Sequence, residues 1–199
     1  VLVVVDEMLY MGFKDELDKV LEATPDTTQT LLFSVTFPRE VEAIARNYMT
    51  KPVEITSGEK NAGSENVSHE FYSVTEGTRY PALKRIADLN PDIYAIIFCR
   101  TRRETQEVAD NLIRDGYSAD SIHGDLSQGQ RDSILGKFRK RTIKILIKTD
   151  VAARGLDVTE LTHVLNHKLP DQIENYTHRS GRTGRAGNKG ISIVLVNGK

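Results

Sequence analysis

Short apolar runs alternate with amphipathic segments along most of the chain, which is the pattern of an α/β protein. Because these runs are apolar throughout, they predict strands that are buried on both faces of a parallel sheet. In the second part of the chain the predicted strands are Glu70–Val74, Ala95–Cys99, Ala119–His123, Ile143–Lys148, His163–Asn166 and Gly190–Val196. Apolar residues at helical spacing predict helices around Pro81–Leu89, Arg103–Arg114, Gln130–Arg139 and Gln172–His178. This part is therefore expected to form one open α/β domain.

The first part of the chain shows the same alternation on a smaller scale. Its predicted strands and helices are Leu2–Val5, Thr30–Ser34, Lys14–Ala23 and Pro38–Met49. A polar run with glycines and no periodicity, residues 57–66, predicts a linker. The sequence thus predicts a first domain segment at 1–56, the linker at 57–66 and a second domain at 67–199.

Charge separates the two parts as well. The 199 residues include 27 Lys and Arg and 28 Asp and Glu, which gives a net charge of −1. Residues 1–66 hold 6 basic and 12 acidic residues, whereas residues 67–199 hold 21 and 16. The basic second part fits a polyanionic partner, although chance differences between solvated surfaces explain the split equally well.

Composition excludes several classes of protein. No apolar run approaches the roughly 20 residues of a membrane helix, so no membrane association is expected. The single cysteine, Cys99, excludes an internal disulfide framework and fits a reducing compartment, which predicts a cytoplasmic location. Five scattered histidines without cysteine partners argue against a structural zinc site, so no metal site is predicted.

The most unusual residues follow the predicted strands, where open α/β sheets bind their ligands. The segment from His178 to Gly187 holds three arginines at a spacing of three, Arg179, Arg182 and Arg185, separated by glycines. Guanidinium groups suit phosphate oxygens and stabilise the charge that develops in phosphoryl transfer. A solvated basic loop or a nonspecific nucleic-acid patch accounts for the composition as well.

Three further segments place hydroxyl, amide and basic groups after strands. They are Thr149 to Asp157, Arg100 to Arg103, and Gln128 to Arg131. The first follows a buried strand, where a hydroxyl and free backbone N–H groups can hold a phosphate. Ordinary helix capping explains any one of these segments alone. Several such loops together indicate a sugar-phosphate backbone as the ligand.

In this order, the segments resemble the motifs of the DEAD-box ATP-dependent RNA helicases. The resemblance covers essentially the whole chain and rests on four segments, Ile97 to Thr101, His123 to Arg131, Thr149 to Asp157 and His178 to Arg185. It implies an α/β fold of the RecA-like type, an open and mainly parallel sheet with helices on both faces. Residues 1–56 would then be an incomplete α/β remnant of a first RecA-like domain, and residues 67–199 the second one.

The resemblance also implies roles for individual residues. Two residues match arginines that contact the γ-phosphate of ATP across a cleft between the domains, Arg182 and Arg185. Positions near the nucleotide are matched by Asp157, His178 and Arg179. Contacts with the RNA backbone are matched by Arg100, Thr101, Gly124, Gln128, Arg131, Thr149 and Gly155. Coupling between the domains is matched by Ser34, Thr36, Asp150 and Arg154.

The family implies ATP and Mg²⁺ as cofactors and single-stranded RNA, bound largely independently of sequence, as the partner. Two departures of this chain from the family pattern concern the ATP site. Val3, Val4 and Val5 stand where that pattern has Asp, Glu and Ala, so the Mg²⁺-associated aspartate and the glutamate that orients the attacking water are absent. No segment reads Gly-x-x-x-x-Gly-Lys-Ser/Thr, the loop that cradles phosphates.

These departures predict a fragment of an ATP-dependent RNA helicase that lacks ATPase activity by itself and binds no cofactor tightly. The alternative is a non-catalytic RNA-binding or interaction module built on the second domain. Because the strands of residues 1–56 would lack sheet neighbours, this segment is expected to dock on the second domain, to self-associate or to be poorly ordered.

Overall fold

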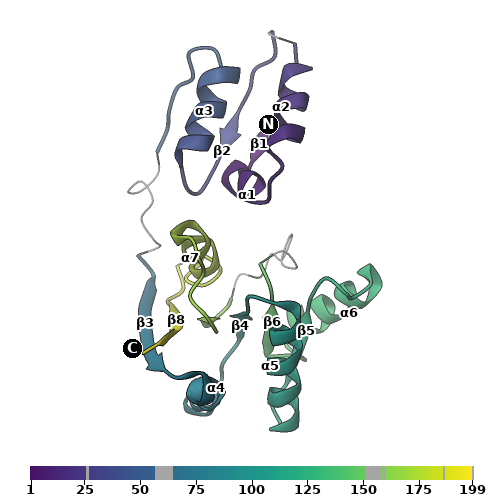
Figure 1. Ribbon diagram of the computed structural model, residues 1–199, viewed down its shortest axis with the longest axis vertical. Helices are drawn as coiled ribbons and strands as arrows, with labels where there is room; N and C mark the ends of the chain where they lie inside the picture. Colours follow the sequence, from purple (N-terminus) through teal and green to yellow (C-terminus); the bar gives the residue numbers. More distant parts are fainter. Residues whose placement is uncertain (26, 57–64, 151–157, 159, 186, 199) are drawn as a thin grey trace. The chain divides into compact units, whose positions relative to one another are not determined.

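The computed structural model describes residues 1–25, 27–56, 65–150, 158, 160–185 and 187–198. The chain divides into two units, Val1–Ala62 and Gly63–Lys199 (Figure 1). The division falls inside the run predicted as a linker, and the assignment of each unit to a helicase domain stays a prediction. In the described ranges no helix is both long and apolar enough to cross a membrane.

A six-stranded sheet organises the second unit. Its strands are β3 (Val67–Val74), β4 (Ala95–Phe98), β5 (Ala119–Ile122), β6 (Ile145–Lys148), β7 (His163–Asn166) and β8 (Gly190–Asn197). They lie in the order β3-β8-β7-β4-β6-β5, and every neighbouring pair is parallel. The predicted α/β class and open sheet are confirmed, and the sheet is parallel throughout.

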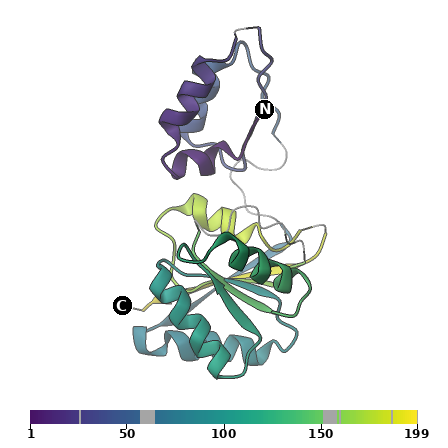
Figure 2. The same ribbon diagram turned by 90° about the vertical axis from the view of Figure 1, so that its right-hand side faces the viewer.

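Helices cover both faces of this sheet, as Figure 2 shows. They are α4 (Glu76–Leu89), α5 (Arg102–Arg114), α6 (Gln128–Arg139) and α7 (Ile173–Ser180). On one face, Leu112 of α5 packs in a core with Ile97 of β4. On the other face, Phe138 of α6 packs in a second core with Ile96 of the same strand. Successive residues of β4 point to opposite faces and both are buried, which explains why the strand is apolar throughout.

Two helices begin earlier than the apolar periodicity predicts. The helix α4 begins five residues before Pro81, because Thr75 and Thr78 form a capping box at its start. The helix α6 likewise begins at a capping box, between Ser127 and Gln130. In both cases polar side chains that pair with backbone N–H groups start the helix before its first buried residue.

The first unit is small and has a core of its own. Its elements are β1 (Leu2–Val3), α1 (Val5–Tyr10), α2 (Lys14–Glu22), β2 (Leu32–Phe33) and α3 (Arg39–Tyr48). Its core consists of Val5, Leu17, Leu21, Val41 and Ile44. The prediction of a strand over Leu2–Val5 is wrong in its second half, because Val4 has a φ of 58° and Val5 begins α1. A short apolar run does not distinguish a buried strand from a buried helix start.

One face of the two-stranded sheet in this unit is apolar and exposed. Val3 and Phe33 are partners in the parallel register, and each is 57% exposed. Leu2 and Leu32, which point to the opposite face, pack against the core of the unit. The expected self-association through the exposed face stays a prediction.

Glycine is required at Gly184, in the turn after α7, and at Gly190, the first residue of β8, because three backbone segments meet there. Gly184 has a φ of 69°, and a Cβ on it would lie 2.6 Å from Val67 Cγ2 and 3.2 Å from the Asn66 carbonyl oxygen. A Cβ on Gly190 would lie 2.6 Å from the Gly184 nitrogen and closer still to Thr183 Oγ1. The turn therefore packs directly on the beginnings of β3 and β8.

Replacing Gly190 by alanine is expected to lower the free energy of unfolding by about 1–3 kcal/mol, because the new methyl group must push backbone atoms apart. The matched control is Gly136→Ala in α6, where an added Cβ meets nothing within 4 Å. The control is expected to raise the free energy of unfolding by about 0.5–1 kcal/mol, since alanine is the better helix former. Urea unfolding followed by circular dichroism measures both, and equal stability of the two variants would contradict the close packing.

Candidate functional site

The strand ends that carry the predicted site residues lie next to one another at one edge of the six-stranded sheet. The strand β4 pairs with β6 on one side and with β7 on the other, so that Phe98 is level with Lys148 and with Asn166. The loops that follow these three strands therefore start side by side. Thr149, the first residue after β6, is half-buried.

A buried arginine holds α7 to this edge. Arg179 donates through Nε and Nη2 to the two carboxylate oxygens of Asp150, at 2.7 and 2.6 Å, and through Nη1 to Asn166 Oδ1 at 2.9 Å. Its guanidinium carbon lies 4.9 Å from the centre of the Phe98 ring. A bidentate pair with a carboxylate fixes both the position and the plane of a guanidinium group. These contacts, which we call the Arg179 anchor, bring together two predicted residues, Arg179 and Asp150.

Arg182 and Arg185 follow on the turn that ends α7. The Arg182 N–H donates to the Arg179 carbonyl at 3.0 Å, and Arg185 Nε donates to the Gly181 carbonyl at 2.8 Å. Both residues are partly buried, as is His178 within the helix. Because the Arg179 anchor holds one side of the turn and the glycine contacts hold the other, the backbone that carries Arg182 and Arg185 is fixed.

A second group of predicted residues gathers where α5 and α6 begin. Thr101 caps α5, and its Oγ1 accepts a backbone N–H of the first turn at 3.1 Å. Arg131 of α6 donates through Nη2 to the Gly124 carbonyl at 3.1 Å. Arg102, the first residue of α5, forms an ion pair with Asp125, which ties the start of this helix to the loop after β5. Both residues lie within the predicted motif segments, although the sequence predicts no role for either.

Two residues predicted to bind RNA make other contacts in the structure. Arg100 donates to the Leu169 carbonyl and to Asp171, both in the loop after β7. Gln128 donates to Asp132 Oδ1 at 2.9 Å, on its own helix. The predicted residues that lie outside the described ranges are Arg154, Gly155 and Asp157.

In the first unit, the two predicted coupling residues, Ser34 and Thr36, contact the backbone N–H and the carboxylate of Asp6, a residue for which the sequence predicts no role. Asp6 Oδ2 accepts hydrogen bonds from the Thr36 N–H at 2.8 Å and from Thr36 Oγ1 at 2.5 Å. The Asp6 N–H donates to Ser34 Oγ at 3.3 Å. Asp6 and Thr36 are both buried. The signal that could have identified Asp6 is its place directly after five apolar residues, where a carboxylate enters a core and requires partners.

One cluster of described residues has the donor set of a metal site, but other groups already occupy its carboxylate. The Cys99 sulfur, a Glu104 oxygen and a His167 nitrogen lie within 4.8 Å of one another. Glu104 already accepts hydrogen bonds from His167 and from the Arg100 N–H, and Lys168 Nζ lies 3.5 Å from one of its oxygens. Burial raises the pKa of the Cys99 thiol, so the thiol stays protonated and is a poor ligand. Within the cluster, Glu104 and His167 therefore form a hydrogen-bonded pair.

Comparison with known proteins shows similarity along almost the whole chain. The family described as "Helicase conserved C-terminal domain" matches residues 78–187. The DEAD-box ATP-dependent RNA helicase CshA of Bacillus cereus is 44% identical over 191 residues, which are 96% of this chain and 36% of that protein. CshA of Bacillus subtilis is 42% identical over 96% of this chain and 39% of its own length. The chain thus spans less than half the length of these relatives.

Solved structures show the same likeness in three dimensions. A DEAD box protein from the hyperthermophile Methanococcus jannaschii matches with a TM-score of 0.66 and 42% identity, over 98% of this chain and 52% of that chain. S. cerevisiae Dbp5 bound to RNA and ADP BeF3 matches with a TM-score of 0.87 and 29% identity, over 99% of this chain and 52% of that chain.

The residues matched by the helicase family make up more than half of the chain, and both curated relatives are DEAD-box helicases. The likeness to the two solved structures confirms the RecA-like fold. The chain belongs to the DEAD-box ATP-dependent RNA helicase family and carries its C-terminal helicase domain.

Proposed function

We propose that this chain is part of an ATP-dependent RNA helicase whose second unit binds the backbone of single-stranded RNA and supplies arginines to an ATP site. The observation that carries the proposal is the Arg179 anchor. It holds the turn with Arg182 and Arg185 at the edge of the sheet where the loops with Thr101 and Gly124 also begin. RNA binding and nucleotide binding would thus share one rigid edge.

Binding to an RNA backbone is supported by the groups at the starts of α5 and α6. Helix N-termini attract anions, because their first N–H groups lack partners within the helix and the helix dipole is positive there. Thr101 adds a hydroxyl at one helix start, and Arg131 adds a guanidinium group at the other. Contacts of this kind reach phosphates and sugars and carry no sequence information, so binding is expected to be independent of sequence.

The residues of the chain fit one side of an ATP site. Arg182 and Arg185 offer guanidinium groups that can neutralise the charge on a γ-phosphate. In the first unit, the position that would hold Mg²⁺ does not fit, because the Val3 side chain has no lone pair to offer. The Val4 side chain, at the position of the glutamate that orients the attacking water, has none either. The nearby Asp6 carboxylate accepts two hydrogen bonds from Thr36. We therefore propose that the 199-residue chain alone hydrolyses ATP negligibly.

The chain is expected to bind a fluorescein-labelled oligouridine with a log affinity that falls linearly with log salt concentration. Arg131→Gln is expected to weaken binding to all sequences alike and to reduce the salt slope by about 0.7, because one phosphate contact is lost. Arg139→Gln, at the other end of α6, is the matched control and should change neither quantity. Fluorescence anisotropy measures both, and no binding at low salt would rule out the RNA-binding part of the proposal.

The chain alone is expected to release no more phosphate from ATP than its Arg182→Ala/Arg185→Ala double variant, with or without RNA. Adding the intact first RecA-like domain of a family member in trans is expected to restore RNA-stimulated hydrolysis to the unaltered chain but not to the double variant. A phosphate-release assay measures both. RNA-stimulated turnover by the unaltered chain alone would contradict the proposal.

The second candidate function is a non-catalytic RNA-binding or interaction module. The observation that favours it is the valine run in place of the carboxylates that the family pattern carries. This module would bind the oligouridine in the same way and would gain no ATP turnover from a first domain supplied in trans. The same complementation assay therefore distinguishes the two functions.

A further inference from the structure

Arg100 connects the loop after β4 to the loop after β7. Its Nη2 donates to the Leu169 carbonyl at 2.7 Å and to Asp171 Oδ1 at 2.5 Å. Asp171 lies two residues before the first residue of α7. Arg100 therefore connects a loop predicted to bind RNA to the segment that leads into α7, the helix that carries Arg179. We call this segment the entrance of α7.

Glu104, in the first turn of α5, makes the same connection closer to the protein interior. One carboxylate oxygen accepts the Arg100 N–H at 2.9 Å, and the other lies 2.8 Å from His167 Nδ1 and 3.5 Å from Lys168 Nζ. Burial alone would raise the pKa of Glu104, but the hydrogen bonds from His167 and from the Arg100 N–H lower it to about 2. Glu104 is therefore ionised at neutral pH, and its two oxygens connect the loop after β4 to the loop after β7.

The two connections differ in strength because they differ in exposure. The side chains of Arg100 and Asp171 are 43% and 79% exposed, and an exposed ion pair contributes little because water screens it. The side chains of Glu104 and His167 are 15% and 8% exposed, and a shielded hydrogen bond to a charged group contributes more. Glu104 is the main connection, and Arg100 reinforces it.

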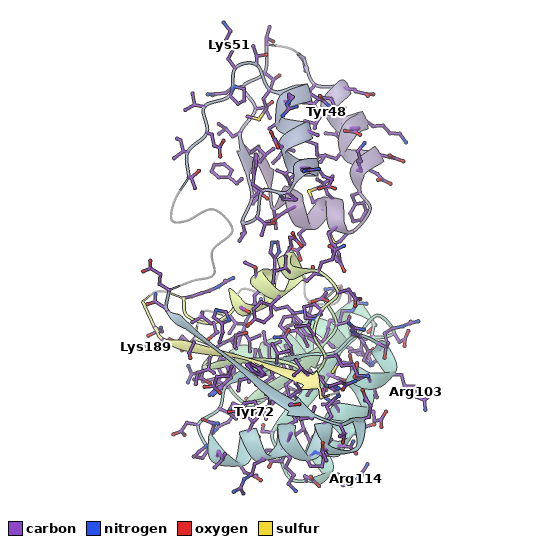
Figure 3. All side chains as sticks on the ribbon, turned by 60° about the vertical axis from the view of Figure 1, so that its left-hand side comes forward. Tyr48, Lys51, Tyr72, Arg103, Arg114 and Lys189 are labelled. Atoms are coloured by element: carbon purple, nitrogen blue, oxygen red, sulfur yellow. The ribbon has the colours of Figure 1, made fainter. Side chains whose placement is uncertain are left out.

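The direction of the Arg100 side chain points to this role and not to a phosphate contact. Its guanidinium group is turned toward the loop after β7, where a carbonyl and a carboxylate receive it. Two arginines of the following helix, α5, extend away from the molecule instead, as Figure 3 shows for Arg103 near the start of the helix and for Arg114 at its end.

We propose that Arg100 and Glu104 are positioning residues that hold the Thr101 loop and the entrance of α7 as one body. RNA contact at Thr101 is then coupled to the placement of the arginines that α7 carries. The inference rests on the proposed function, because it concerns the same RNA-binding loop, and it replaces the direct RNA contact that the family resemblance implies for Arg100.

The salt dependence of RNA binding separates a positioning role from a direct contact. The probe is a fluorescein-labelled oligouridine, titrated with the whole chain at several KCl concentrations. Glu104→Gln is expected to weaken binding roughly tenfold and Asp171→Asn roughly threefold, both with an unchanged slope of log affinity against log salt. A direct phosphate contact predicts a different result, in which Arg100→Gln reduces the slope by about 0.7 and Asp171→Asn does not weaken binding.

A double variant tests whether Arg100 and Asp171 act as a pair. The Arg100→Gln/Asp171→Asn variant is expected to bind RNA no more weakly than the Arg100→Gln variant, since the effects of substituting two residues that act together are not additive.

Hydrogen–deuterium exchange provides a readout without RNA. Exchange in residues 173–185 is expected to be faster in the Glu104→Gln and Asp171→Asn variants, because the entrance of α7 is released.

Two exposed residues of α5 provide matched controls, Glu107→Gln and Arg114→Gln, and neither is expected to change affinity or exchange. Because Asp171 is largely exposed, its variant gives an answer even where circular dichroism shows that Glu104→Gln has not folded. No RNA binding by the unaltered chain would overturn the proposed function together with this inference. Normal RNA binding, with affinity and exchange both unchanged in Asp171→Asn, would overturn the inference alone.

Discussion

The second unit depends on one buried positive charge that is neutralised where three strands end. Arg179 comes from α7, but its partners come from elsewhere in the chain: Asp150 follows β6, Asn166 ends β7 and Phe98 ends β4. A buried charge that loses its partner is strongly destabilising, because the remaining group is left uncompensated in a medium of low dielectric. Strand order, helix placement and the orientation of the arginine turn are therefore tied to one set of contacts.

A second buried arginine, Arg79, also connects segments that are distant in the sequence. Arg79 of α4 is 2% exposed, and its Nη1 donates to the carbonyls of His167 and Leu195 at 2.6 and 2.8 Å. It thus joins a helix on one face of the sheet to the ends of β7 and β8. Buried guanidinium groups with several donors in one plane suit this task, since each satisfies carbonyls or carboxylates from different segments at once. The edge of the sheet at which the strands end is therefore polar, and the contacts of Arg79 and Arg179 hold its segments in place.

Much of this arrangement could be predicted from the sequence, and the limits have physical reasons. The strands β4, β6 and β7 are buried on both faces, so their apolar runs located them closely. The strand β3 is mostly exposed, and it begins three residues before the predicted strand Glu70–Val74. The motifs identified Arg179 and Asp150, but the spacing of the arginines does not reveal which one turns inward. Arg179 turns inward because Asn166 and Phe98 contact it. Both residues are distant from Arg179 in the sequence, and no local sequence pattern indicates that they contact it. Similarly, the run that ends in Val5 gives no sign that a helix begins there.

The place of β8 in the sheet has a consequence for the synthesis of the protein. Among the described strands it comes latest in the sequence, yet it lies between β7 and β3, the earliest strand of the sheet. All eight residues of β3 pair with β8, so the backbone of β3 finds its partner only when residues 190–197 have left the ribosome. Until then the backbone of β3 is unpaired, and the strand carries exposed aromatic residues such as Phe71. Pairing between strands as distant in the sequence as β3 and β8 is slow. Until residues 190–197 have been made, the backbone of β3 is therefore open to pairing with other chains or to binding by chaperones.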